Sequence, residues 1–412
     1  MERKYKESGI EWIGIVPESW QSKRFKYSGI FEKGKLPYSS NIDRIGMPII
    51  GASEMLGKDA RTYTSDELVP QCKEDDILIL WDGANAGITA SGLKGVVSST
   101  AVKYTCLDRC ILPKYAAYLL KYAEHYFKEK VNGTTIPHMN MDFINDIPLL
   151  CPPLAEQQRI ASYLDEKCGE IDSLIGLQEQ MNEKLKAYKQ SVITEAVSKG
   201  LDPNAKLVPS GIDWIGEIPE GWETIRIKYL LRERKERSET GEEEPLSMSQ
   251  KFGLIPTKDM DMIPNMASSF IGAKVVYVSD LVFNKLKAHL GVFSVSKYNG
   301  LVSPDYAVYY STGRAELKYL EYLFKTPQCI GEFRKRSTGV GAGLTRLYTD
   351  DLYSIFIPFP PLSEQHSIAF YLDEKCADID RLIALKQRKI ESLKDYKKSV
   401  IFEAVTGKTI IE

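Results

Sequence analysis

The sequence repeats itself at a fixed spacing, and this duplication limits the possible folds more than any other feature of the 412 residues. Residues 152–157 (PPLAEQ) recur as residues 360–365 (PPLSEQ), and the match keeps the same register, 208 residues later, as far as Ile193 and Ile401. A shorter block, residues 8–14 (SGIEWIG), recurs as residues 210–216 (SGIDWIG). Such self-similarity indicates a duplicated structural unit.

The stretches between the repeated blocks, about 25–145 and 230–350, do not resemble each other. The chain therefore reads as variable module, shared block, variable module, shared block. We expect a first module over residues 1–150, a shared helix over 151–200, a second module over 201–357 and a second shared helix over 358–412. Such an arrangement suits a protein that grips two different things at a fixed separation.

Each shared block predicts one long helix that begins after a proline pair, which favours a non-helical conformation ahead of it. Apolar residues spaced by about 3.5 positions predict a coiled-coil seam. At 1.5 Å per residue, about 40 residues span roughly 60 Å, and two such helices can bury their stripes in an antiparallel pair. The alternative is that each helix packs only on its own module. The predicted seam consists of Ile160, Leu164, Ile171, Leu174, Met181, Leu185, Tyr188 and Val192 with Ile368, Leu372, Ile379, Leu382, Leu393, Tyr396 and Val400.

The variable modules mix short strands and helices, which predicts an α+β fold. Residues 76–81, 280–283 and 307–310 read as buried strands, and residues 115–126 and 317–324 read as helices. The whole chain is thus expected to have two α/β-mixed globular domains, separated by two long helices and related by a pseudo-twofold repeat.

Several loops of these modules combine glycine with small polar and basic residues. Glycine lets a backbone approach a duplex closely, while Arg and Lys suit phosphate or guanine and Asn suits adenine. Taken singly, each could equally be an ordinary surface loop. Phosphate contact is expected most at the cluster from Arg334 to Arg336, since a glycine-rich loop follows it. The candidate DNA-binding residues are Asn85, Thr134, Thr135, His138, Gln250, Lys251, Asn284, Lys285, Lys287, His289, Arg334, Lys335, Arg336, Thr345 and Arg346.

The bulk composition narrows the classes of protein. The net charge of −2 excludes a globally basic coat, so DNA binding would depend on local basic patches. Seven irregularly spaced cysteines predict neither a disulfide framework nor a metal site. No stretch approaches the roughly 20 apolar residues of a membrane span. We therefore expect a protein of the reducing cytoplasm that does not associate with membranes.

The ordered, duplicated motifs resemble the specificity subunits of type I restriction-modification enzymes. The resemblance rests on residues 147–157 and 357–365, the segment 9–14, and the helix ends 194–197 and 403–407. It implies two target-recognition domains that each read half of an interrupted site in double-stranded DNA. It also implies two modification (methyltransferase) subunits docked on the shared helices, together with ATP-dependent restriction subunits. S-adenosylmethionine and the catalytic residues would belong to those partners, so this chain is expected to have no catalytic residue, cofactor or metal.

Two other functions are weighed against this one. A stand-alone nuclease would need a carboxylate constellation, and none repeats in both modules. A coiled-coil scaffold that binds only proteins would show no sequence-dependent DNA footprint. No phosphate-binding loop, dinucleotide fingerprint or amino-methyltransferase motif is present in the sequence.

Overall fold

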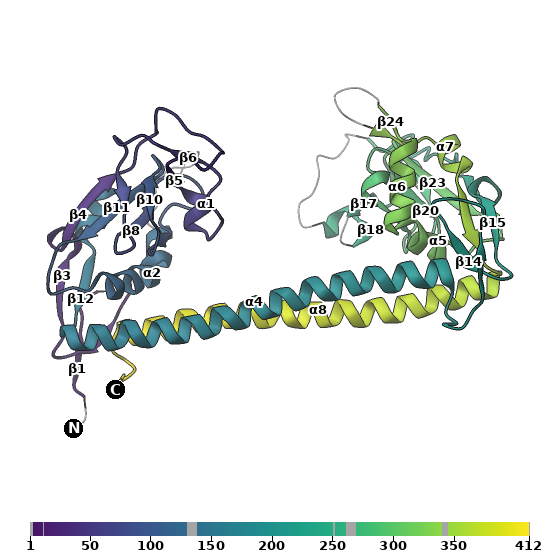
Figure 1. The fold of residues 1–412 in the computed structure, drawn as a ribbon. Coiled ribbons are helices and arrows are strands. Elements are labelled where there is room, and N and C mark those ends of the chain that lie inside the picture. The colour runs from purple at the N-terminus through teal and green to yellow at the C-terminus, as the bar shows by residue number, and fades with distance from the viewer. Residues whose placement is uncertain are drawn as a thin grey trace. The chain divides into compact units, whose positions relative to one another are not determined.

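A computed structural model describes residues 3–10, 12–129, 138–249, 252–260, 269–339 and 345–411 (Figure 1). The chain forms two compact units. Unit 1 consists of residues 1–179 and 387–412, and unit 2 consists of residues 180–386. Two long helices, α4 (Leu154–Lys199, 46 residues) and α8 (Leu362–Val405, 44 residues), each contribute to both units. Within the described residues no helix is both long and apolar enough to cross a membrane.

The described part of unit 1 contains twelve short strands and three α-helices besides its portions of α4 and α8. Four strands form an antiparallel sheet in the order β4-β11-β8-β9, and a second sheet has the order β6-β5-β10-β7. The strands are β1 (Tyr5–Glu7), β2 (Ile15–Pro17), β3 (Gln21–Arg24), β4 (Gly29–Lys33), β5 (Met47–Ile50), β6 (Tyr63–Thr64), β7 (Gln71–Cys72), β8 (Ile77–Leu80), β9 (Thr89–Ala90), β10 (Gly95–Val97), β11 (Ala101–Cys106) and β12 (Pro148–Cys151), and the helices are α1 (Ala52–Met55), α2 (Pro113–Glu129) and α3 (Met141–Asp146).

Unit 2 repeats the main sheet of unit 1 with a different sequence, in the order β16-β23-β20-β21. The smaller sheets differ, because unit 2 has the separate pairs β17-β18 and β19-β22. Its strands are β13 (Leu207–Pro209), β14 (Glu217–Pro219), β15 (Glu223–Arg226), β16 (Leu231–Glu233), β17 (Leu246–Ser249), β18 (Gly253–Pro256), β19 (Lys274–Val276), β20 (Leu281–Asn284), β21 (Phe293–Val295), β22 (Gly300–Val302), β23 (Tyr306–Ser311), β24 (Thr338–Gly339), β25 (Thr345–Arg346) and β26 (Phe356–Phe359), and its helices are α5 (Leu317–Phe324), α6 (Pro327–Arg336) and α7 (Thr349–Ser354).

The predicted strands and helices of the modules are present. The apolar run of β8 is buried at every residue, as expected for a strand covered on both faces. Its counterpart β20 pairs with β23, Leu281 lying opposite Tyr309. In unit 1 the helix α2 lies between the main sheet and α4, and its buried residues recur at helical spacing (Figure 1). In unit 2 the corresponding helix is divided into α5 and α6, because Thr326 caps a new helix that begins at Pro327.

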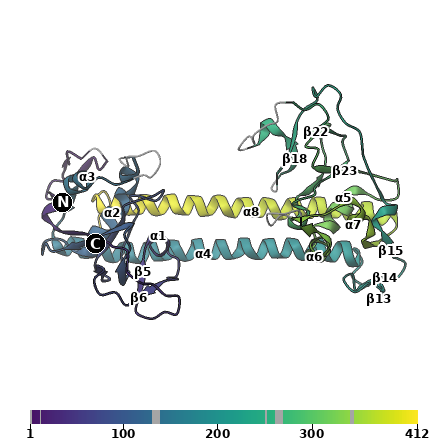
Figure 2. The ribbon, with the colours of Figure 1, turned by 90° about the horizontal axis from the view of Figure 1, so that it is seen from above.

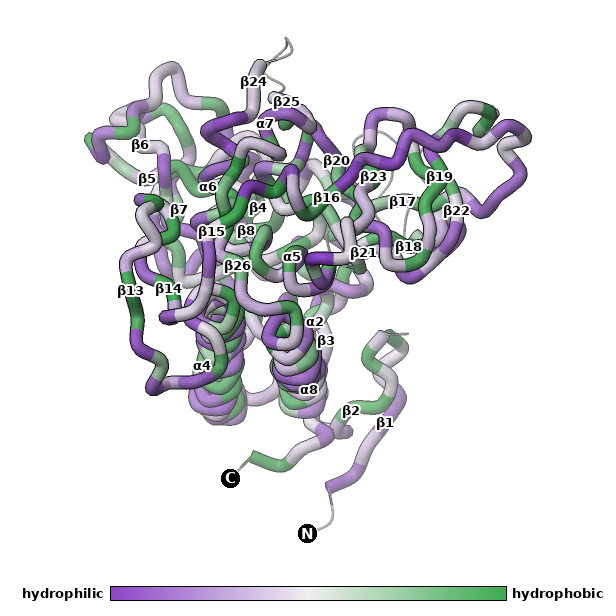
Figure 3. The backbone as a smooth tube through the Cα atoms, turned by 90° about the vertical axis from the view of Figure 1, so that its right-hand side faces the viewer, coloured by the Kyte–Doolittle hydropathy of each residue, from purple (hydrophilic) through white to green (hydrophobic). Residues whose placement is uncertain are grey.

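Within each unit, a part of α4 lies alongside a part of α8 (Figure 2). In unit 1 the Lys397 ammonium contacts the Asp172 carboxylate at 2.6 Å, and in unit 2 Lys189 contacts Asp380 at the same distance. The two pairs occupy equivalent positions of the repeat. The partners also show that the helices run antiparallel, which confirms the predicted pairing. Both helices carry hydrophilic and hydrophobic residues, as expected of helices that bury only one stripe (Figure 3).

One column of the predicted seam is wrong by one position. Leu174, Met181, Tyr188, Leu382 and Tyr396 are 44–58% exposed, whereas Ile175, Asn182 and Ile390 are buried. The residues that face the other helix in this part of the seam lie one position later, and several of them are polar, including Asn182, Lys189 and Lys397. Choosing the apolar neighbour at each of these places moved the prediction one residue towards the N-terminus. The other predicted seam residues are buried or half-buried.

The repeated motif at the start of each long helix joins the helix to its unit. The Gln157 side chain, fully buried, accepts the Leu112 N–H at 2.8 Å and donates to the carbonyls of Cys110 and Pro152. Gln365 accepts the Glu316 N–H at 2.9 Å and donates to Pro360 in the same manner.

A glutamate and a tyrosine strengthen this joint in both units. The indole N–H of Trp20 donates to Glu156 at 3.1 Å, and that of Trp222 donates to Glu364 at 3.0 Å. Tyr115 of α2 donates to the Val405 carbonyl near the end of α8, and its counterpart Tyr319 donates to Val197 near the end of α4. The shared sequence blocks are therefore explained by polar contacts that attach each module to the ends of both long helices.

Candidate nucleic-acid interface

The structure gathers five of the candidate residues of unit 2 into one cluster. Asn284 ends β20, and Lys285 and His289 lie in the turn that follows it. Thr345 and Arg346 form β25, and the Leu347 N–H donates to the Lys285 carbonyl at 3.0 Å. The Thr345 hydroxyl lies 3.4 Å from Nδ1 of His289. Two loops separated by about sixty residues in the sequence thus meet at the end of the main sheet.

This cluster concentrates positive charge that is only partly compensated. Burial lowers the pKa of the half-buried Lys285 ammonium, and the nearby cations of Lys274 and Arg346 lower it further. Lys274 forms an ion pair with Glu233 at 2.9 Å, and that carboxylate also accepts the Thr349 hydroxyl. Lys285 therefore lies near the cations of Lys274 and Arg346, and the nearby Glu233 carboxylate already accepts hydrogen bonds from Lys274 and Thr349.

Arg346 lies in this cluster, and only part of its guanidinium is hydrogen-bonded. Its Nη2 donates to Oδ1 of Asp305 at 3.0 Å. Its Nε is buried and has no hydrogen-bond partner within the part of the chain that the structure describes. An arginine of this kind suits a bidentate acceptor, such as a phosphate or a guanine edge.

The basic cluster at the end of α6 is less available than the sequence suggested. Lys335 contacts the buried Glu332 carboxylate at 2.8 Å, and Arg336 forms an ion pair with the same group. Burial raises the pKa of Glu332, but the hydrogen bonds and the positive charges of these two cations together lower it by more, so the carboxylate stays charged. Arg334 is exposed, as is Lys287 in the β20–β21 turn. Of the three residues at the end of α6, Arg334 is the one best placed to meet a phosphate.

In unit 1 the corresponding surface has different side chains. Nδ1 of His138 lies 2.6 Å from Oδ1 of Asp82, and the other carboxylate oxygen lies 3.7 Å from the Lys33 ammonium. Asn85 is exposed in the turn between β8 and β9. The candidates Thr134, Thr135, Gln250 and Lys251 lie outside the described residues.

The two surfaces share one backbone connection. In unit 1 the Met139 N–H donates to the Trp81 carbonyl at 3.0 Å, and in unit 2 the Leu347 N–H donates to the Lys285 carbonyl at 3.0 Å. Trp81 follows β8 and Lys285 lies at the equivalent place after β20. His138 and Arg346, the residues before the two donors, are likewise equivalent. The same backbone geometry thus presents Trp81, Asp82 and His138 in one unit and Lys285, Leu286 and Arg346 in the other.

Sequence reasoning missed the acidic members of both surfaces. Asp82 and Asp305 contact candidate residues directly, and Glu233 holds the neighbouring Lys274. Asp82 lies in a glycine-containing loop that the sequence did single out, so its proximity to Asn85 was a usable signal. The other two acids come from β16 and from the turn before β23, and only the folded sheet brings them near.

Nothing in the described residues suggests catalysis by a metal. No group of three or more His, Cys, Asp or Glu side chains in that part of the chain could hold a metal ion. All seven cysteines are free thiols, and burial raises the pKa of those at 72, 106, 151, 168, 329 and 376. These thiols stay protonated near neutrality and are poor nucleophiles.

Comparison with known proteins shows one consistent similarity. A family model described as the type I restriction modification DNA specificity domain matches residues 17–187. The type I restriction enzyme MjaVIII specificity subunit of Methanocaldococcus jannaschii is 28% identical, over 98% of this chain and 96% of that protein. Over almost its whole length the chain is similar to type I restriction enzyme specificity subunits.

Two further comparisons agree with that similarity. A putative type I restriction enzyme MjaX specificity subunit from the same organism is 27% identical, over 98% of this chain and 97% of its own length. A solved chain from work on complex assembly and conformational transition of the type I restriction-modification system superposes with a TM-score of 0.70. It covers 96% of this chain and 99% of its own, at 16% identity, and so supports the specificity-subunit fold. The alternatives of a stand-alone nuclease and a purely protein-binding scaffold are not favoured.

Proposed function

We propose that this chain is the non-catalytic subunit that selects the DNA target of a type I restriction-modification enzyme. Each unit reads one half of an interrupted site in double-stranded DNA, and α4 and α8 join the two readers. Residues 1–150 and 201–357 are the two target-recognition domains, and residues 151–200 and 358–412 are the shared helices. The chain acts in the cytoplasm, and methyl transfer, ATP-driven translocation and cleavage are carried out by partners.

The observation that carries this proposal is the shared backbone connection with divergent side chains. A protein that gripped the same object twice would be expected to repeat its contact residues as well as its fold. Here the polar contacts of the framework recur at equivalent residues, while the side chains beside Trp81 and Lys285 differ. Side chains that differ in hydrogen-bonding pattern and charge are the means of reading different base edges.

The duplicated framework also supports the choice of partners. Two copies of one surface, related by an internal repeat, suit two copies of one docking protein. We therefore propose that two modification subunits dock on the repeated blocks, and that restriction subunits join this assembly. The DNA-contacting residues that we propose are the candidates named from the sequence, with Lys285 and Arg346 at the centre of the unit 2 surface.

The test is to map methylated bases in a host that carries this chain with its modification subunit. We expect one bipartite site with an unmethylated spacer of fixed length. His138→Ala in unit 1 should relax the choice of bases in one half-site, and Lys285→Ala in unit 2 should relax it in the other. Methylation at a continuous site, or a change of both halves by either single substitution, would contradict two independent readers.

A further inference from the structure

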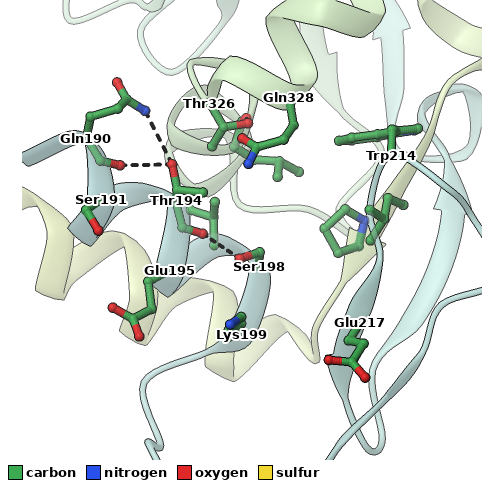
Figure 4. Close-up of a pocket in the computed structure, with 14 residues that line it drawn as sticks. Gln190, Ser191, Thr194, Glu195, Ser198, Lys199, Trp214, Glu217, Thr326 and Gln328 are labelled. Atoms are coloured by element: carbon green, nitrogen blue, oxygen red, sulfur yellow. Dashed lines mark hydrogen bonds between the residues drawn. The ribbon is translucent and has the colours of Figure 1, made fainter. Parts of the chain in front are cut away.

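Unit 2 contains an open pocket beside the C-terminal end of α4, with a volume of about 550 Å³. Residues of α4, including Gln190, Thr194 and Ser198, form one side, and Trp214 forms the other (Figure 4). Thr326 and Gln328, from the junction between α5 and α6, complete it. Trp214 is the single aromatic residue among the described residues that line this pocket.

Unit 1 fills the equivalent place with aromatic rings. Trp12 is the counterpart of Trp214 in the repeated block SGI(E/D)WIG. The rings of Tyr122 and Phe402 stack there, with centroids 4.7 Å apart and an interplanar angle of 26°. Trp12 lies 6.0 Å from the Tyr122 ring and stacks on Tyr126 at 5.8 Å.

The repeat shows which residues have replaced these rings. Thr194 precedes Phe402 by the 208 residues that separate the two long helices. Thr326 follows Tyr319 by seven positions, as Tyr122 follows Tyr115. Threonines therefore stand in unit 2 at the positions that Tyr122 and Phe402 occupy in unit 1, while the tryptophan is present in both units. The pocket is the space that two aromatic side chains occupy in the other copy.

The chemistry of the lining matches an aromatic side chain with a polar edge. The Trp214 face can stack on another ring. The threonine hydroxyls are already engaged, since Thr194 donates to the Gln190 carbonyl at 2.9 Å and Thr326 donates to Leu323 at 2.7 Å. Gln190 and Gln328 also line the pocket, and although Nε2 of Gln190 donates to the Thr194 hydroxyl at 3.4 Å, the two amide oxygens can accept a hydrogen bond from a phenol or an indole N–H. An apolar cavity of roughly 150 Å³ already accepts benzene, so the space here is ample for one such group.

We propose that this pocket receives an aromatic side chain of a modification subunit, and that the two copies of the framework therefore hold their partners unequally. The inference rests on the proposed function, in which two identical subunits dock on the repeated blocks. At unit 1 that side chain meets a surface already filled by Tyr122 and Phe402. At unit 2 it enters the pocket and stacks on Trp214, so the partner at unit 2 binds more tightly and first.

The decisive variant is Thr194→Phe, which restores the ring of unit 1 at its equivalent position in unit 2. Stepwise binding of the modification subunit is measured by isothermal titration, with native mass spectrometry counting the bound copies. The wild type should show two unequal steps, and Thr194→Phe should weaken the tighter step by roughly 30-fold or more, the loss expected for a central aromatic anchor. Thr194→Val, which changes the volume little and adds no ring, should leave both steps unchanged. Equal steps in the wild type, or an unaltered tighter step in Thr194→Phe, would overturn the proposal.

A second measurement does not depend on a folded Thr194→Phe protein or on the partner. p-Cresol is titrated into the wild-type chain, and the indole N–H resonance of Trp214 is followed by NMR. We expect a saturable shift at millimolar concentration, with the resonance of Trp12 unaffected. A Trp214 resonance that does not move would refute an aromatic pocket. If the modification subunit does not bind the wild type at all, the proposed function fails, whatever p-cresol shows.

Discussion

Arg346 and Asp305 offer a direct test, because the two members of one ion pair are expected to act in opposite directions on DNA binding. Their side chains are 26% and 65% exposed, so solvent screens the pair and its contribution is about 0.2–1 kcal/mol. If Arg346 leaves Asp305 to contact DNA, that contribution is lost on binding. Asp305→Asn removes the loss, and should raise the affinity for specific DNA by about 1.5- to 5-fold.

Arg346→Gln should have the opposite effect. Loss of a guanidinium that contacts a base edge costs about 1–3 kcal/mol, which is roughly 5- to 150-fold in affinity. If the contact is to a phosphate instead, the slope of log K against log salt should become shallower by about 0.9. Fluorescence anisotropy with the assembled methyltransferase complex, at several salt concentrations, measures both quantities.

The control is an ion pair of the same chemistry away from the proposed interface. Arg381 and Asp378 form such a pair on α8 at 3.4 Å, and both side chains are well exposed. Arg381→Gln and Asp378→Asn should change neither the affinity nor the salt slope. A purely structural role for the Arg346 pair predicts that both of its substitutions weaken DNA binding together. That result would refute the reasoning.

Three further outcomes follow from buried polar groups. Gln365→Leu leaves the Glu316 N–H and the Pro360 carbonyl without their hydrogen-bond partner, and should lower the free energy of unfolding of unit 2 by about 2–5 kcal/mol in urea titrations. Gln158→Leu, at an exposed position, should leave the free energy of unfolding unchanged. Asn182→Leu should raise the melting temperature, because the buried Oδ1 has no partner among the described residues; a lower melting temperature would show that this position needs a polar group. Two lysines hold the pKa of Glu321 below its ordinary value despite burial, so its stabilising effect is present above about pH 4–5 and is lost as the pH falls through the folded pKa; Glu321→Gln should weaken unit 2 near neutrality and flatten its loss of stability in acid, and an unchanged acid slope would contradict this.

The two long helices were predictable from sequence because their apolar residues recur at helical spacing and the whole block is duplicated. The predicted seam residues Leu164, Ile171, Leu372 and Ile379 are apolar, and the structure buries all four. The second column was not predictable, because Lys189 and Lys397 occupy it and are stabilised by carboxylates on the other helix. A search for apolar residues cannot find a seam position that is occupied by a lysine paired with a carboxylate on the other helix.

The proposed interface was predictable only in part, for a related reason. Glycine and basic residues marked loops that the structure brings together, and the predicted strand over 280–283 ended just before Asn284. The meeting of Lys285 with Arg346 depends on a backbone hydrogen bond between segments about sixty residues apart, which leaves no local signal. Similarly, the neutralisation of Lys335 and Arg336 by Glu332 depends on helical spacing and burial, and a charge count along the sequence does not reveal it.

The shared backbone connection explains how the two units can diverge without losing their fold. The hydrogen bonds from the Met139 N–H to Trp81 and from the Leu347 N–H to Lys285 join main-chain atoms only. The side chain at the accepting position can therefore be Trp in one unit and Lys in the other. Attachment to the long helices depends instead on side chains such as Gln157 and Gln365, and these are repeated unchanged. Substitution beside Trp81 or Lys285 is therefore expected to cost little stability, while substitution of the framework glutamines is expected to cost more. A chain built in this way can change one half of its target while the other half, and the docking of its partners, stay as they were.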